Sequence, residues 1–507
     1  MEEQIGEHER TIIKLKRARN SLLNISKLPP EVLGDIFRRN VTLKNDFDGL
    51  EKGSRNFLLV CHHWFEVASR TPEVWSFWGN TLTDWARWHR HYGAAPLDLV
   101  LGIGDHYHYG GTLDNTICDA LRDHAARDAI RRVHLWSQEA ALLGSIISPL
   151  TSTGEGVRSI SVESFILQSH VGSPPVDVSD FLAHYRFPRL QRLELDNCAI
   201  TSWDLLTSRT AVLTSLTLRF SHPSPTPTTS QLFSILASNP SLCKLSLSRY
   251  AVPTDGGGES SHQVPLHYLK ELKLAGAPRH VFGLIHQLEH PTNVDLEITL
   301  CNYTVADVPR IVGPYLRDYL QRRDRSQMGL GLAVSRLGRL SVLHIGDVGG
   351  IELSTLVWMA PFVEIVMELD QEPQGPLEKG VLDLFAYLPR DEVIFLHSLV
   401  EPAAIEDMST QFPNLRALRS VSIPLHTVFP APNLDGNEGA PTSLQHIRLE
   451  LPIVDGGGWS PLTTFLTRRA SSGNRLESLT IDRPPRLYLD VEERIRSMVQ
   501  EFRVTWE

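Results

Sequence analysis

A short apolar unit, L-x-x-L-x-L, recurs along the chain after residue 130 and constrains its fold more than any other feature. In the clear copies another apolar residue sometimes replaces a leucine; these copies are Leu190/Leu193/Leu195, Leu213/Leu216/Leu218, Leu242/Leu245/Leu247, Leu269/Leu272/Leu274, Leu340/Leu343/Ile345, Leu444/Ile447/Leu449 and Leu476/Leu479/Ile481. The first four begin 23, 29 and 27 residues apart, and the last two begin 32 apart. Residues two apart share one face of a strand, so each unit predicts a strand with an apolar and a polar face.

Helical patterns lie between these strands. Ser230 can cap a helix that ends before Asn239-Pro240, and residues 281–288, 311–320 and 461–469 show similar patterns. A strand followed by a helix at each step resembles the leucine-rich repeat, whose units bury a continuous core only by stacking on one another. The spacing is irregular, and a non-repetitive α/β domain is the competing interpretation.

A second pattern occupies residues 28–75. Two prolines open a predicted helix that runs to residue 39, and its apolar residues recur at helical spacing. An apolar block at 57–60 precedes Trp64 in the next expected helix, and a Thr-Pro turn then leads to Trp75. About three short helices are too small to bury all this apolar surface. The surplus should pack on the rest of the chain or be covered by another protein.

The motifs LPPEVL, VCxxW and TPxxW occur here in the order that they have in the F-box, and this segment resembles that family. The RTPEVW ending is most similar to F-box proteins of mushroom-forming fungi. F-box proteins bind the small S-phase-kinase-associated adaptor of SCF ubiquitin ligases and, through it, a cullin. The resemblance implies that the adaptor-contacting residues are Leu28, Pro29, Val32, Ile36, Phe37, Val60 and Trp64. The polar stretch at 44–55 leaves the register of the second helix open.

The resulting fold class is α/β (α+β), with a small three-helix F-box followed by an irregular leucine-rich-repeat-like solenoid. We expect an N-terminal helix at 1–24, the F-box at 25–78, a linking helix and first strand at 79–129, and the solenoid at 130–507. The amphipathic segment 491–502 should be a helix that caps the last repeat.

The N-terminal helix has a marginal heptad pattern formed by Ile5, Ile12, Leu15 and Leu22. A coiled coil needs several sustained heptads. We therefore expect this helix to pack beside the F-box or to fray, rather than to form a dimer.

Bulk properties exclude several functional classes. The net charge of −10 gives no electrostatic support for binding nucleic acid. Five widely separated cysteines do not suggest a disulfide framework and fit a reducing compartment. Acidic residues follow Met1 where a secretory signal would begin, and no apolar run approaches the roughly 20 residues that span a bilayer. We expect no membrane association and a cytoplasmic and/or nuclear location.

Possible catalytic motifs are weak. Asp105, His106 and His108 could hold a divalent ion, although no further His or Cys ligand lies close by, and a polar loop is the stronger interpretation. A Cys61–His62 nucleophile pair would need adjacent helical positions that point apart. The glycines at 329–334 lack the third glycine of a phosphate-binding loop, so we expect a strand or turn. We expect no metal, no cofactor and no catalysis by this chain.

The outward positions of the strands should face a partner. Their charges are mixed in sign, and interfaces usually anchor on Trp, Tyr or Arg. Arg192, Arg219 and Arg448 are therefore the candidate substrate-facing residues, the alternative being that they are simply solvated. The patterns together predict a non-catalytic substrate receptor of an SCF-type ubiquitin ligase for an unknown protein substrate. The alternatives are a repeat-based scaffold with no ligase role and an enzyme with a metal at His106 and His108.

Overall fold

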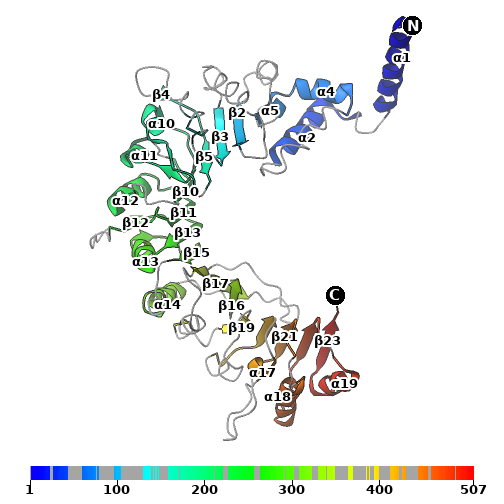
Figure 1. Cartoon of the computed structure of the whole chain (residues 1–507), viewed down its shortest axis with the longest axis vertical. Coiled ribbons are helices and arrows are strands. Elements are labelled where there is room, and N and C mark those ends of the chain that lie inside the picture. The colour runs from blue at the N-terminus through cyan, green and yellow to red at the C-terminus, as the bar shows by residue number, and fades with distance from the viewer. Residues whose placement is uncertain are drawn as a thin grey trace. The chain divides into compact units, whose positions relative to one another are not determined.

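The computed structural model divides into two compact units, residues 1–242 and 243–507. The structure describes residues 2–22, 27–43, 60–75, 77–78, 96–103, 130–138, 141, 143–144, 147, 158–170, 172–209, 212–220, 226–255, 263–291, 293–301, 308–322, 329–337, 340–348, 363–368, 384, 387–388, 393–398, 412–421, 425–429, 443–454, 458–485 and 487–506. The expected linking helix before residue 96 and the His106/His108 cluster lie outside these residues. Each unit is described by itself below (Figure 1).

The first unit begins with helices. They are α1 (Glu2–Ser21), α2 (Pro30–Leu43), α4 (His62–Ser69) and α5 (Pro72–Trp75). Helix α2 begins at the proline that the sequence indicates, because a proline at the first helical position lacks only an N–H that would have no intrahelical partner. The peptide N–H of Leu33 donates to the carbonyl of Pro29 at 3.0 Å and closes the first turn. Helix α2 therefore starts where expected and runs four residues beyond the predicted end at residue 39.

A parallel sheet follows the helices in the first unit. Its strands are β1 (Phe77–Trp78), β2 (Leu97–Ile103), β3 (Ile130–Ser137), β5 (Ser164–Ser169), β8 (Arg192–Asp196) and β10 (Ser215–Phe220), paired in that order. Leu193 of β8 is in register with Phe165 of β5 and Leu216 of β10, and all three side chains are buried. The apolar positions of the repeated unit thus form one continuous inner face.

Three helices of the first unit lie on one side of the sheet. They are α10 (Ser179–His184), α11 (Asp204–Arg209) and, after β10, α12 (Thr229–Ala237) (Figure 1). The N-terminal cap of α12 differs from the sequence prediction, because it is Thr228 and not Ser230. The Thr228 hydroxyl accepts a hydrogen bond from the N–H of Gln231, and the side-chain oxygen of Gln231 accepts one from the N–H of Thr228. This reciprocal pair satisfies two helix-end donors at once, which a cap at Ser230 would not do.

Short parallel strand pairs and a buried asparagine join neighbouring strand–helix segments within the first unit. Strand β4 (Arg158–Ser159) pairs with β7 (Tyr185–Arg186), and β6 (Val176–Asp177) pairs with β9 (Cys198–Ala199). Asn197 has a φ of 53°, a conformation that asparagine tolerates better than most residues. Its side-chain amide donates to the carbonyls of His170 and Ser173, each at 2.9 Å, and so ties the turn after β8 to the preceding repeat.

The second unit contains another sheet, in whose middle one strand, β17 (Leu340–Val348), runs antiparallel to its neighbours. Its strands are β11 (Lys244–Arg249), β13 (Glu271–Gly276), β15 (Asp295–Leu300), β16 (Gly329–Leu337), β17 (Leu340–Val348), β18 (Val363–Glu368), β19 (Val393–Ser398), β20 (Ala417–Val421), β21 (His446–Glu450), β22 (Ser478–Asp482) and β23 (Glu501–Thr505). Their order is β11-β13-β15-β18-β17-β16-β19-β20-β21-β22-β23, and all pairs are parallel except β18–β17 and β17–β16.

The antiparallel section has a simple cause in the sequence. Only two residues separate β16 from β17, and a two-residue connection makes a hairpin, whereas a parallel crossover needs about a dozen residues or more. The glycine-containing segment 329–334 is accordingly a strand, one of the two structures expected for it. The repeat copy at 340–345 also forms a strand, but it runs against its neighbours and does not continue a regular array.

The second unit carries the helices α13 (Pro278–His286), η3 (Val308–Val312), α14 (Gly313–Arg322), α17 (Leu425–Val428), α18 (Ser460–Ser471) and α19 (Leu489–Met498), and a short pair of strands, β12 (Val264–Pro265) and β14 (Leu288–Glu289). The predicted cap helix is shorter than expected, because Phe502 lies in β23. Phe502 is in register with Leu479 of β22, so the last strand extends the sheet and buries this ring. Among the helices that the structure describes, none combines the length and apolarity needed to cross a bilayer.

Candidate binding surfaces

The three short helices of the first unit build a small core of their own. Leu33 and Phe37 of α2 and Ala68 of α4 are fully or almost fully buried. The ring centroids of Phe37 and Trp64 are 5.2 Å apart. The indole Nε1 of Trp75 donates to the carbonyl of Ala68 at 2.7 Å, which fixes α5 against α4. The motif residues therefore hold one another in place.

Phe37, one of the predicted adaptor-contacting residues, lies in the core of the three-helix unit. Its side chain is only 1% exposed, so in this conformation it belongs to the core and offers no surface to a partner. The reason is that α2 is apolar on two faces, and Trp64 packs against the face that carries Phe37. Spacing along the helix alone did not show which apolar face turns inward.

A neighbouring face of α2 remains open. Val32 and Ile36 are 46% and 43% exposed, and they lie four residues apart, which places them on one face of the helix. Pro29 is also exposed, whereas Leu28 and Trp64 are half-buried. Val60, which precedes α4, is exposed as well. We call Pro29, Val32, Ile36 and Val60 the exposed apolar set.

Phe65 was missed by the sequence prediction. Its side chain is exposed on α4, directly after the half-buried Trp64. Adjacent helical residues point in different directions, and this rule identifies Phe65 as a candidate surface residue once Trp64 is assigned to the core.

Charged side chains follow the exposed apolar face of α2. Asp35 receives a hydrogen bond from Arg38, which holds the pKa of this carboxyl below its usual range. Arg39 also contacts Asp35, with 3.0 Å between Nε and Oδ2. Apolar residues with a charged border are the usual composition of a protein interface.

The outward positions of the first sheet carry linked charges. Arg192 and Glu194 are 3.0 Å apart within β8, and Arg219 of β10 lies 3.6 Å from Glu194 and 3.7 Å from Asp196. Both arginine side chains remain about half exposed. Gln168 of β5 donates to Glu194 at 3.1 Å. The structure thus brings two of the three predicted arginines together around a buried glutamate.

His134 of β3 lies beside this group. Burial lowers the pKa of His134 to about 4, although a hydrogen bond with Gln168 and the charge of Glu194 oppose that shift. At neutral pH its imidazole is therefore uncharged. The sequence interpretation did not single out this histidine, whose only signal was its outward position between the apolar residues Val133 and Leu135.

Two ladders of alternating charge cross the second sheet. Lys244, Glu271, Lys273 and Glu297 form one across β11, β13 and β15, with 2.5–3.1 Å between paired atoms. Partial burial acts to raise the pKa of Glu271, but hydrogen bonds from both lysines hold it below its usual value.

Arg448 belongs to the second ladder. Its Nε lies 2.9 Å from Glu450 and 2.7 Å from Asp482, and Arg419 reaches Glu450 at 2.7 Å. Arg448 is less exposed than Arg192 and holds two carboxylates at once. Of the three predicted arginines it is therefore the one most committed to intramolecular contacts.

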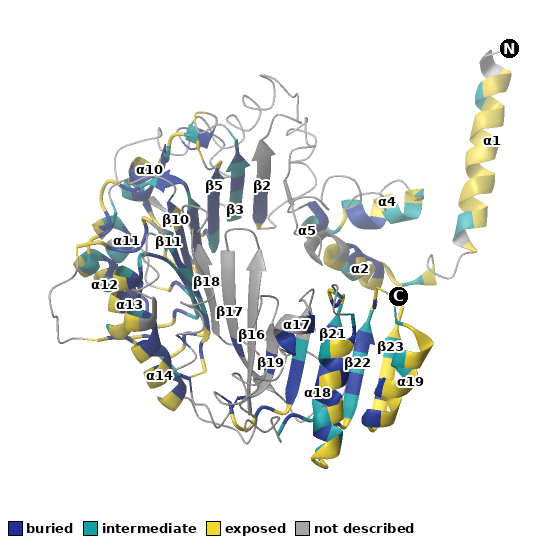
Figure 2. Cartoon of the chain, turned by 60° about the horizontal axis from the view of Figure 1, so that its bottom comes forward, coloured by how far each residue is buried: buried dark blue, intermediate teal, exposed yellow. Residues whose placement is uncertain are grey.

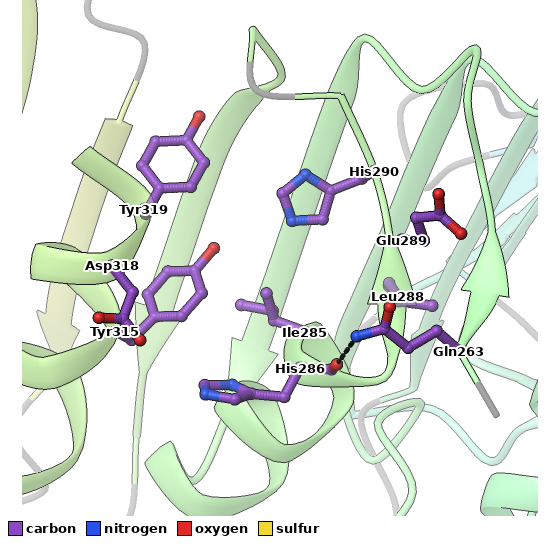
Figure 3. A pocket seen from close by; sticks show the side chains of 9 residues that line it. All are labelled: Gln263, Ile285, His286, Leu288, Glu289, His290, Tyr315, Asp318 and Tyr319. Carbon is purple, nitrogen blue, oxygen red and sulfur yellow. Dashed lines mark hydrogen bonds between the residues drawn. The ribbon is translucent and has the colours of Figure 1, made fainter. Parts of the chain in front are cut away.

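A pocket of about 180 Å³ lies among α13, β14 and α14 in the second unit (Figure 3). Its lining combines rings and polar groups: Gln263, Ile285, His286, Leu288, Glu289, His290, Tyr315, Asp318 and Tyr319. The Tyr319 hydroxyl donates to the carbonyl of Val294 at 2.8 Å, and the rings of Tyr315 and Tyr319 stack with centroids 5.9 Å apart. The hydrogen bond of Tyr319 holds α14 beside the start of β15.

Catalytic groups do not converge in the part of the chain that the structure describes. Within it, no three His, Cys, Asp or Glu side chains are placed to hold a metal ion. His62 begins α4 and faces Glu66 at 3.5 Å. Burial raises the pKa of the Cys198 thiol, so this sulfur stays protonated and is a poor nucleophile.

No family model matches the chain, and no curated protein matches it, so the candidate surfaces rest on the chain's own side chains.

Proposed function

We propose that this chain is the substrate-receptor subunit of an SCF-type cullin-RING ubiquitin ligase. In this proposal the three-helix unit is an F-box that docks the S-phase-kinase-associated adaptor and, through it, a cullin. The strand and helix units form a leucine-rich-repeat-like solenoid that presents a protein substrate. The observation that carries the proposal is the arrangement of α2, in which Phe37 closes a core while Val32 and Ile36 remain exposed on another face.

The exposed apolar set is a physical reason for a partner. Fully burying a Val or Ile side chain contributes about 1.5–3 kcal/mol, so covering the exposed half of each contributes about 1 kcal/mol. Val32, Ile36 and Val60 together could then supply several kcal/mol of binding free energy. Asp35 with its two arginines would lie at the border, where charge pairs favour orientation more than affinity.

The parallel sheets support the second half of the proposal. In both, buried leucines alternate with outward polar side chains, as a solenoid with one binding face requires. The antiparallel section at β16–β18 departs from a uniform array. Arg192 and Arg219 are the better substrate contacts because they keep about half of their side-chain surface exposed. This chain would hold the substrate close to the other subunits of the ligase, which would carry out ubiquitin transfer. It would need no cofactor for that role.

One observation favours the alternative of a repeat-based scaffold with no ligase role. Helix α5 runs almost directly into β1, which pairs with β2 and joins the three-helix unit to the sheet. A unit attached in this way could serve as the end cap that a stacked array needs. The exposure of Val32 and Ile36 supports docking over a purely capping role, because a cap would cover them. Both proposals are consistent with a cytoplasmic or nuclear location.

The decisive experiment is co-expression of the full chain with the adaptor of its host, followed by size-exclusion chromatography. We expect a one-to-one complex with the wild type and no complex with Ile36→Asp, since a carboxylate there would have to be desolvated in the interface. Leu489→Asp is the matched control, because Leu489 is an exposed leucine on α19 and should not affect binding. Trp64→Ala is less informative, because Trp64 packs on Phe37 and its loss would disturb the fold.

Two results would contradict the ligase proposal. The first is the absence of any complex when both proteins are folded, and the second is equal binding by the wild type and Ile36→Asp. Strong hydrogen-exchange protection around Ile36 in the isolated chain would then support the capping role.

A further inference from the structure

Helix α1 carries an apolar stripe that nothing in the described structure covers. Ile5, Ile12, Leu15 and Leu22 are between 51% and 75% exposed, and Figure 2 shows the helix exposed along almost its whole length. The sequence interpretation expected this helix to pack beside the three-helix unit or to fray. Instead it is helical from Glu2 to Ser21, with its large apolar side chains open to solvent.

The spacing of the stripe is that of a two-helix seam. Ile5 and Ile12 are seven residues apart, Leu15 and Leu22 are seven apart, and the two series are offset by three, which is the a/d pattern of a heptad. A helix of 20 residues is about 30 Å long, and most of the stability of a helix in a protein comes from packing its apolar face against a partner. A second helix of similar length, laid along the stripe, would cover all four side chains.

The charges of α1 indicate what that second helix is. Its acidic residues, Glu2, Glu3, Glu7 and Glu9, all precede its basic residues, Arg10, Lys14, Lys16, Arg17 and Arg19. A copy of the same helix in parallel orientation would place acidic half against acidic half and basic half against basic half. In antiparallel orientation each acidic half meets a basic half. We propose that α1 pairs with α1 of a second copy of this chain in antiparallel orientation.

A specific register follows from the heptads. Ile5 of each copy packs on Leu22 of the other, and Ile12 packs on Leu15 of the other. Glu9 and Lys16 occupy the positions that flank the seam on the same side, so each Glu9 faces Lys16 of the second copy, twice by symmetry. Arg17 lies on the outer face. The seam also places His8 across from Arg19 of the second copy, a polar layer that favours one register while lowering stability.

Sedimentation equilibrium of the full chain tests the association and its charge pairing together. We expect a concentration-dependent dimer that Ile12→Asp abolishes. Glu9→Lys should weaken the dimer about tenfold, since it turns two attractive pairs into repulsive ones. The double variant Glu9→Lys/Lys16→Glu should restore it, because the swap recreates both pairs, and the outer-face control Arg17→Glu should have a smaller effect than Glu9→Lys.

Cysteine cross-linking tests the orientation. The double variant Ile5→Cys/Leu22→Cys should form a disulfide between copies, whereas each single variant should show only the wild-type background. The two positions are about 25 Å apart along one helix, so they cannot bridge within a copy. Three results would overturn the proposal. They are a full chain that stays monomeric up to about 100 µM, a dimer that survives Ile12→Asp, and ready cross-linking of Ile5→Cys alone. The proposal does not depend on a ligase role.

Discussion

The ring of Trp64 on α4 packs against the ring of Phe37 on α2, with 5.2 Å between their centroids and an inclination of 55°. This tilted contact decides how α2 is rotated. With Phe37 turned toward Trp64, Leu33 also faces inward, and Val32 and Ile36 face outward. The contact therefore separates the residues that fold the three-helix unit from those available to a partner.

Phe37→Ala should destabilise the three-helix unit, whereas Ile36→Ala should not. Removing a buried phenylalanine typically costs about 3–5 kcal/mol, because transfer free energy is lost and a cavity remains. Surface substitutions usually change stability by no more than about 0.5 kcal/mol. Hydrogen exchange of the amides in α2 and α4 measures the difference. Equal exchange in the two variants would show that Phe37 is not the core residue described here.

Gly313→Ala and Gly283→Ala should have opposite effects in the second unit. Alanine in place of a helical glycine normally adds about 1 kcal/mol of stability. A Cβ at Gly283 meets no atom within 4 Å, so this variant should show the gain. A Cβ at Gly313 would lie 2.5 Å from the ring of Tyr387, over which Arg317 packs, and such overpacking typically costs about 1–3 kcal/mol. Thermal denaturation compares the two variants, and a stabilised Gly313→Ala would contradict the packing around Tyr387.

His134 should make the first unit sensitive to mild acid. Its pKa in the folded chain is about 4, below the ordinary value of 6.5. As the pH falls from about 6.5 toward 4, the unfolded chain takes up a proton that the folded chain does not, so the free energy of unfolding decreases, by up to about 3 kcal/mol. His134→Gln should remove this contribution while Gln168, Glu194 and Arg192 remain around the site.

NMR titration of His134 checks the same prediction directly. We expect its imidazole to titrate near pH 4. A midpoint near the ordinary value would show that the site is hydrated and that its burial between β3, β5 and β8 is lost in solution.

Arg448→Ala should cost more stability than Arg192→Ala. Arg448 is 31% exposed and lies between Glu450 and Asp482, two carboxylates that would be left close together without it. We expect a loss of about 1–2 kcal/mol, diminished by salt. Arg192 is 53% exposed, and exposed pairs contribute at most about 1 kcal/mol. Chemical denaturation at low and high salt compares the variants; a larger cost at Arg192 would reverse the assignment of which arginine is free to contact a substrate.

Much of the local structure is predictable from the sequence. The repeated unit located the strands β8, β10, β11, β13, β21 and β22, because apolar residues two apart must share a buried face. Pro30 marked the start of α2, because its restricted backbone suits the first helical turn. For residues 329–334 the sequence excluded a phosphate-binding loop and left a strand or a turn open, and the structure has a strand there.

Tertiary structure decided the features for which the local pattern allowed two answers. Helix α2 is apolar on two faces, and only the position of Trp64 determined that Phe37 is buried and Ile36 exposed. Phe502 fits a helical pattern, but pairing with β22 made it a strand residue, since a neighbouring strand satisfies its backbone hydrogen bonds and covers its ring. Apolar spacing fixes which residues share a face, because it depends on one element alone. Which face turns inward depends on free energies of contact with residues far along the chain, and these the local sequence does not contain.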